Sequence, residues 1–107
     1  MEIKGIYRHF KGNRYRVLGE GICEGESYII YRQMYGDEGY WMRPFEMFFS
    51  AKEQDGEKIV RFTRIEDSTE GLPTGEALSA IRLNHSETLE KYCITGDEET
   101  GYLLKKA

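Results

Sequence analysis

The sequence predicts a mainly β fold, a small β-barrel or roll followed by a short α/β extension. Twelve of the fourteen aromatic residues lie before residue 66, and aromatic side chains favour strands and supply large buried areas. The same stretch alternates apolar and polar residues in short runs between turn residues, which is typical of small strands. The length of 107 residues fits one small domain. An open sheet is the alternative, but a closed barrel leaves no aromatic edge strand exposed.

The first strands are predicted from alternation on both sides of a tight turn. Residues 5–10 and 14–18 alternate around a turn at 11–13, where Gly and Asn tolerate positive φ. Residues 19–25 are expected to form a glycine-rich loop. The strongest strand is expected at 27–35, because β-forming side chains follow one another there.

A corner and a hairpin are predicted to complete the aromatic region. A turn is expected at residues 36–39, a strand at 40–43, and a helical turn or irregular corner at 45–49. Two hairpin strands follow at 49–54 and 57–65. Pro44 ends the strand before it, since proline cannot donate to a sheet ladder. The dipeptide Asp55-Gly56 is a strong signal for the hairpin turn.

The charge distribution divides the chain at the same place as the aromatic residues. Residues 1–65 carry 11 basic and 10 acidic groups, whereas residues 66–107 carry 4 basic and 9 acidic groups. We therefore predict a barrel module over 1–65, a linker over 66–75 that is rich in Gly, Pro, Ser and Thr, and an acidic extension over 76–107. The net charge of -4 thus comes from residues 66–107 and says little about what the barrel binds.

Within the extension, a helix and a hairpin are expected. Apolar residues at helical spacing predict a helix over 75–83. Asn84 and Glu87 have the spacing of a capping box, which predicts a second helical turn. Two strands over 91–95 and 101–105 are expected to pair as a hairpin.

Composition also excludes some classes of protein. No apolar run approaches the length of a membrane helix, so no membrane partner is expected. The first residues lack the apolar core of a secretory signal, and two cysteines in that context predict free thiols in a cytoplasmic protein. The acidic balance argues against non-specific nucleic-acid binding.

Several short motifs occur in a characteristic order: YRHFKG at 7–12, YRQMYGD at 31–37, WMRP at 41–44, MF at 47–48 and RF at 61–62. Together they resemble the small bacterial family known as domain of unknown function 1653. The resemblance covers residues 5–65. It implies a small barrel of the SH3-like roll type, and it implies no activity.

One motif of that family is displaced in this chain. The family usually has His-Ser-Glu-Thr, often followed by Leu-Glu, between its second and third strands, where this chain has no histidine. The sequence HSETLE occurs instead at 85–90, and GDEETGY at 96–102 resembles GDEGY at 36–40. The extension therefore resembles a degenerate partial repeat of the barrel. A partial duplicate, a segment that folds back to replace the missing loop, and chance all account for this pattern.

Nucleophilic catalysis and zinc binding are not favoured by the sequence. The imidazoles and thiols are His9, Cys23, His85 and Cys93, with no pair at the spacing of structural zinc ligands. Acidic residues around Cys23 would raise the pKa of its thiol. The glycine-rich segment 19–25 matches neither a Walker loop nor a dinucleotide fingerprint. We predict no catalytic residue, no metal and no cofactor.

Nucleic-acid binding is a further hypothesis. Arginine side chains stack on bases and contact phosphates. Those in the aromatic region are Arg8, Arg14, Arg16, Arg32, Arg43, Arg61 and Arg64. The acids in the same region nearly cancel their charge, and cross-strand ion pairs are the simpler interpretation.

The sequence therefore favours a non-enzymatic binding module for a peptide, protein or small ligand. The predicted ligand-binding residues in the barrel are Tyr7, His9, Trp41 and Arg43, although positions inside family motifs can reflect the fold instead. One alternative is an enzyme or ligand-sensing site that uses His85 and Glu87 beside the barrel. The other is a nucleic-acid-binding accessory domain.

Overall fold

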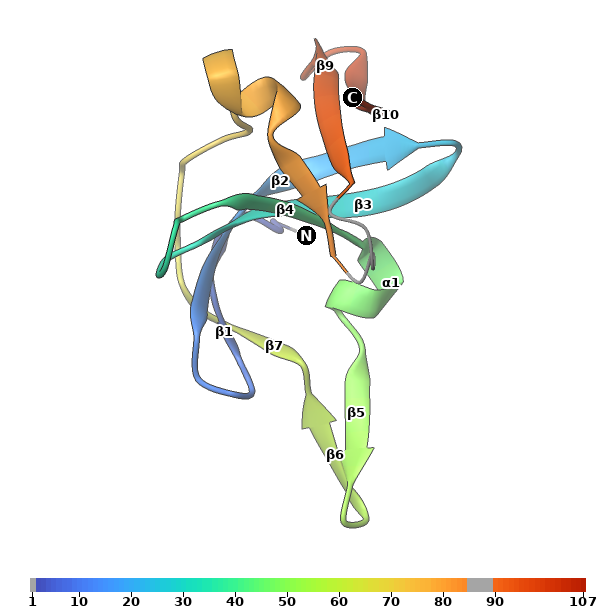
Figure 1. Ribbon diagram of the computed structural model, residues 1–107. Coiled ribbons are helices and arrows are strands. Elements are labelled where there is room, and N and C mark those ends of the chain that lie inside the picture. The colour runs from blue at the N-terminus through green and yellow to red at the C-terminus, as the bar shows by residue number, and fades with distance from the viewer. Residues whose placement is uncertain (1, 85–89) are drawn as a thin grey trace.

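A computed structural model describes residues 2–84 and 90–107. Ten strands and two short helices lie within these residues (Figure 1). In chain order the elements are β1 (Gly5–His9), β2 (Arg14–Cys23), β3 (Glu26–Gln33), β4 (Tyr40–Pro44), α1 (Phe45–Phe48), β5 (Ala51–Gln54), β6 (Glu57–Val60), β7 (Phe62–Glu66), the 3-10 helix η1 (Gly75–Ser79), β8 (Ile81–Leu83), β9 (Lys91–Asp97) and β10 (Gly101–Lys106).

Six of these described strands close into a barrel. The main sheet runs β10-β9-β8-β4-β3-β2-β1-β7, and β10 also pairs with β2 in parallel, at Leu103 and Ile22. The ring therefore consists of β2, β3, β4, β8, β9 and β10, while β1 and β7 extend from the first half of β2. The predicted mainly β barrel is confirmed.

The barrel interior forms one hydrophobic core. Strands β3 and β4 direct Ile30 and Met42 inward, and the later strands contribute Ile81, Ile94 and Leu104. Each of these side chains is buried. Three of the five come from residues after the predicted linker, so the barrel is built from both of the predicted parts of the chain.

A second core lies on the outer face of the same strands. Side chains alternate along a strand, so the neighbours of the inward-facing residues point away from the barrel. Tyr31 and Ile29 of β3 pack there with residues of β1, β2, β7 and α1. The rings of Phe48 and Phe62 are stacked 4.1 Å apart in this core. Strands β3 and β4 therefore serve two cores, and the outer one is the more aromatic.

Most of the predicted strands are confirmed, and two predictions are wrong. The segment 19–25 is not a loop, because β2 continues to Cys23 after a bulge between Val17 and Gly19, and the turn is Glu24-Gly25 with both φ angles positive. The helix predicted over 75–83 ends at Ser79 as η1. Burial and pairing between β4 and β9 make Ile81–Leu83 a strand, so tertiary packing overrides the helical spacing.

The predicted corner and hairpins are confirmed. Residues 45–48 form the single helical turn α1. Asp55 and Gly56 both have positive φ at the turn between β5 and β6, and this hairpin projects away from the rest of the chain (Figure 1). Strands β9 and β10 pair from Gly101 opposite Asp97 to Lys106 opposite Tyr92. Within the described residues, no helix has the length and apolar character needed to cross a membrane.

Candidate functional site

An aromatic pocket of about 170 Å³ lies on the outer face of the sheet. Its lining residues come from β2, β3, β4 and the segments that follow β3 and β8; they are Tyr15, Tyr31, Gln33, Tyr35, Trp41 and Asn84. The strand register explains the grouping, because Tyr15 lies opposite Gln33 and Tyr31 lies opposite Trp41. Residues opposite one another in an antiparallel pair share a face of the sheet. We call these six residues the aromatic pocket.

Hydrogen bonds fix the tyrosines of the aromatic pocket. The Nδ2 group of Asn84 donates to the hydroxyl of Tyr31. The hydroxyls of Tyr15 and Tyr35 lie 2.6 Å apart, and either one can donate. Burial raises the pKa of the Tyr15 and Tyr31 hydroxyls, so both are neutral around pH 7.

Trp41 lines the pocket beside Tyr31. The guanidinium of Arg82 lies 4.4 Å from the centre of the indole and 3.2 Å from a carboxylate oxygen of Asp37. The indole nitrogen Nε1 of Trp41 and the Oε1 atom of Gln33 are both buried, and neither has a hydrogen-bond partner within residues 2–84 and 90–107. A buried N–H donor and a buried oxygen acceptor thus lie unpaired on residues of one pocket, an unusual arrangement in a folded protein.

Arg43 is a buried cation beside this pocket. It is only 5% exposed, its guanidinium hydrogen-bonds to Tyr31, and its Nε and Nη1 atoms have no hydrogen-bond partner among the described residues. Its guanidinium lies 5.3 Å from the ring centre of Phe62, and its charge partly offsets the rise in the pKa of Tyr15 and Tyr31. No carboxylate of the residues that the structure describes forms a salt bridge with it. A buried charge without a counter-ion is costly, which makes Arg43 a candidate ligand group.

The other predicted barrel residues lie deeper or to one side. Tyr7 is buried in the outer core, where its hydroxyl donates to the carbonyl oxygen of Ile3 at 2.9 Å. His9 contacts the rings of Phe62 and Tyr15, with centroids 4.9 and 6.5 Å away. Burial lowers the pKa of His9, and the nearby charges of Arg43 and other basic residues lower it further. Neither Tyr7 nor His9 lines the aromatic pocket.

His85 and Glu87, which define the alternative site, lie outside the described residues. The same holds for most of the displaced HSETLE motif. Its last residue, Glu90, is described: the Nζ of Lys106 donates to its carboxylate at 3.0 Å, and its carbonyl oxygen accepts a bond from the Leu83 backbone N–H. In the sequence, this motif begins directly after Asn84, which lines the aromatic pocket.

Only Trp41 of the six pocket residues is among the residues predicted from the sequence; the five that are missing are Tyr15, Tyr31, Gln33, Tyr35 and Asn84. Alternation could have indicated Gln33, because Tyr31, Gln33 and Tyr35 are spaced two residues apart along one face of a strand. Tyr15 lies on the same face, since it is paired with Gln33. The contribution of Asn84 depends on β8 pairing in parallel with β4, a long-range contact that no local pattern indicates.

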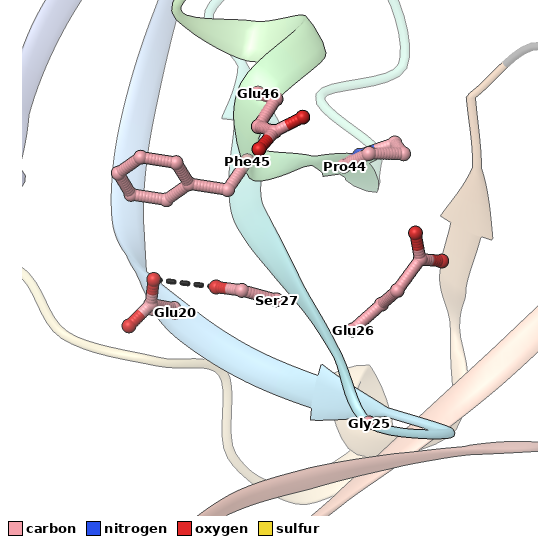
Figure 2. Close-up of a pocket in the computed structure, with 7 residues that line it drawn as sticks. All are labelled: Glu20, Gly25, Glu26, Ser27, Pro44, Phe45 and Glu46. Atoms are coloured by element: carbon pink, nitrogen blue, oxygen red, sulfur yellow. Dashed lines mark hydrogen bonds between the residues drawn. The ribbon is translucent and has the colours of Figure 1, made fainter.

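A second hollow, of about 400 Å³, lies where β2 and β3 approach the start of α1. Figure 2 shows Glu20, Glu26 and Glu46 around it, with Phe45 along one side. Glu20 accepts a hydrogen bond from the hydroxyl of Ser27. No group of three His, Cys, Asp or Glu side chains among the described residues is placed to hold a metal ion. We interpret this hollow as a solvated acidic surface.

The described cysteines and arginines do not form a second candidate site. Cys23 and Cys93 are half-buried free thiols. Burial, and then the charges of Glu24 and Glu26, raise the pKa of Cys23, as the sequence predicts for the acidic neighbours. Several arginines have acidic neighbours: Arg16 lies 3.9 Å from Glu70, and Arg64 lies 2.9 Å from Asp67.

Comparisons with known proteins identify one family and one similar crystal structure. The family described as "Protein of unknown function (DUF1653)" matches residues 5–64, which include β1 to β6 and the first residues of β7. A crystal structure of a protein belonging to DUF1653 from Bordetella bronchiseptica is similar, with a TM-score of 0.56 and 24% identity. The similarity covers 64% of this chain and 92% of that one. No curated protein matches the sequence.

Proposed function

We propose that this chain, which belongs to the DUF1653 family of proteins of unknown function, is a non-enzymatic binding module for a peptide, protein or small ligand. The proposed binding site is the aromatic pocket. The observation that carries the proposal is the pair of buried, unpaired polar atoms, Trp41 Nε1 and Gln33 Oε1, on residues that line it.

Buried polar groups in proteins are almost always hydrogen-bonded. Leaving one unpaired costs about 1–3 kcal/mol. A ligand that accepts from Trp41 and donates to Gln33 recovers this free energy, while the tyrosine rings supply apolar contact area. The lining side chains thus support binding with a defined orientation.

The character of the lining favours binding over catalysis. Its six residues are tyrosine, tryptophan, glutamine and asparagine. General acid–base catalysis is most effective when a side chain titrates near the working pH. The raised pKa values of Tyr15 and Tyr31 move these hydroxyls away from that range.

A thermal-shift screen against small acids, amides, nucleotides and short peptides tests the proposal, because a ligand that binds the folded state raises its melting temperature. We expect at least one class to stabilise the protein and to lose this effect in Gln33→Leu, which removes the unpaired acceptor. Gln54→Leu on the projecting hairpin is the matched control and keeps the effect. Stabilisation that survives in Gln33→Leu, or none in the whole screen, contradicts the proposed site.

A further inference from the structure

We infer that the aromatic pocket takes a carboxylate group whose carrier also has an N–H group close by, as in an N-acylated amino acid or the C-terminal residue of a peptide. This inference rests on the proposed binding function and goes beyond it by naming the chemical class of the ligand. It is carried by the guanidinium of Arg43, which hydrogen-bonds to Tyr31 but has no carboxylate partner among the described residues, and by the direction of the hydrogen bonds in the pocket.

The sign of the charge beside the pocket favours an anion. Arg43 is a full positive charge, buried beside the ring of Phe62 and without an acidic partner among residues 2–84 and 90–107. Its charge is felt at the hydroxyls of Tyr15 and Tyr31, both of which line the pocket. None of the lining residues that the structure describes is acidic. A carboxylate in the pocket would therefore supply the counter-ion that Arg43 does not find in the described part of the chain.

Aromatic walls by themselves would also suit a cationic ligand, since ring faces attract cations. Here a cation already occupies that role on Trp41, because the Arg82 guanidinium lies over the indole at 4.4 Å. A second cation in the pocket would be repelled by the nearby positive charges of Arg43 and Arg82. Of these two, only Arg82 is paired with a described carboxylate, that of Asp37. The electrostatics therefore select an anion over a quaternary or methylated ammonium group.

The hydroxyl protons of the pocket are available for a carboxylate. Tyr31 accepts a hydrogen bond from Asn84, so its own proton is left to donate. In the Tyr15–Tyr35 pair one hydroxyl donates to the other, so the proton of the second hydroxyl is available to donate to a ligand. The Nε1–H group of Trp41 is a third donor. Carboxylate oxygens accept from several donors at once, and bonds to a charged acceptor are the stronger ones.

Gln33 explains why the ligand needs an N–H group as well. Its Oε1 atom is a buried acceptor that lacks a donor. Gln33 lies opposite Tyr15 and two residues after Tyr31, on the same face as the hydroxyls. A carboxylate alone would leave this acceptor unpaired, whereas an amide N–H next to the carboxylate pairs both. The cavity of about 170 Å³ has room for one small residue and not for an extended peptide.

The fluorescence of Trp41 provides the test, because it is the single tryptophan of the chain. The full chain is titrated with N-acetyl-alanine, with its C-terminal amide and with propionate. We expect N-acetyl-alanine to bind at least about tenfold more tightly than either of the others, the change that one charged hydrogen bond brings. N-acetyl-Ala-Ala then separates the sources: binding equal to N-acetyl-alanine favours a peptide C-terminus, and much weaker binding favours a small acid.

Two variants test whether Arg43 and Tyr31 cause the preference for the acid over the amide. Arg43→Met keeps the aliphatic length and removes the charge, so the preference for the acid over the amide should disappear, while Arg8→Met on the exposed end of β1 leaves it unchanged. If Arg43→Met does not fold, Tyr31→Phe serves instead, because it removes a single hydroxyl and should weaken binding of the acid several-fold without changing that of the amide.

Equal binding of the acid and the amide, or an unchanged preference in Arg43→Met or Tyr31→Phe, overturns the inference. Absence of binding by every probe also overturns it. In either case a stabilising ligand from the thermal-shift screen that depends on Gln33 would leave the proposed binding function intact, so the two failures are distinguishable.

Discussion

At the scale of single residues, the hydroxyl of Tyr31 joins two segments that are distant in the sequence within the aromatic pocket. It accepts a hydrogen bond from Asn84, which lies 53 positions later in the sequence. We expect Tyr31→Phe and Asn84→Ala each to lower the free energy of unfolding by about 1 kcal/mol, the net value of a typical hydrogen bond. The double variant should lose little more than either single one, because both remove the same bond. Urea unfolding measures all three, and fully additive losses would show that the bond contributes nothing.

His9 yields a prediction about pH at the same scale. Burial, Arg43 and other basic neighbours lower its pKa below 6.5, so the folded protein holds His9 neutral where the unfolded chain binds a proton. The corresponding stability is therefore present above pH 6.5 and is lost as the pH falls through that value toward the pKa of the folded state. NMR titration of the ring protons should place His9 below 6.5, with His85→Gln used to assign the two signals. A value at or above 6.5 would contradict this environment.

The residues of the site differ in how far the sequence can predict them. Trp41 and Arg43 were named from their position in a strand motif, and both lie at the aromatic pocket or directly beside it. That Arg43 is buried was not predictable, since alternation places it on the face of Ile29 without showing that the face is covered by a second core. Tyr7 was named on the same grounds as Trp41, and its hydroxyl bonds to a backbone carbonyl. Local motifs thus indicate the strand and face, and packing decides which side chain reaches the pocket.

At the scale of elements, the β9–β10 hairpin depends on two glycines with different constraints. Gly96 and Gly101 both have positive φ, at +105° and +87°. A Cβ atom at Gly96 would come within 2.1 Å of the carbonyl oxygen of Gly101, whereas one at Gly101 meets nothing within 4 Å. We expect Gly101→Ala to cost roughly 1 kcal/mol from backbone strain, and Gly96→Ala about 1–3 kcal/mol more from the steric conflict. Equal losses of stability in urea would contradict the close approach of these strands.

The same scale shows where pattern reading fails. The hairpins at 51–60 and 91–106 follow from turn residues and alternation, which act locally. Strand β8 is only three residues long, and its neighbours β4 and β9 determine its conformation. The end of β2 contains Gly19 and Gly21, which suggest a loop, yet pairing with β3 continues to Cys23 opposite Glu26. At β8 long-range pairing overrides a local preference, and at the end of β2 the pairing of the β2–β3 hairpin does so.

At the scale of the whole molecule, the barrel is closed by strands that lie beyond the family match. That match ends at residue 64, whereas β8, β9 and β10 complete the ring around Ile30 and Met42. The acidic extension is thus part of the barrel wall. Whether the predicted module 1–65 folds without it is a separate question, which depends on how much of the inner core those strands provide.

A chain that ends at residue 67 tests this dependence. It loses Ile81, Ile94 and Leu104, and burying each such side chain contributes about 1.5–3 kcal/mol. Their sum approaches the whole stability of a typical small domain, about 5–15 kcal/mol. We therefore expect residues 1–67 to bind a hydrophobic dye and to unfold without a cooperative transition, because Ile30 and Met42 become exposed. Leu104→Ala in the full chain is the milder control and should remain cooperative while losing about 2–5 kcal/mol. Cooperative unfolding of residues 1–67 with a loss below about 2 kcal/mol would instead show that the outer aromatic core is sufficient for folding.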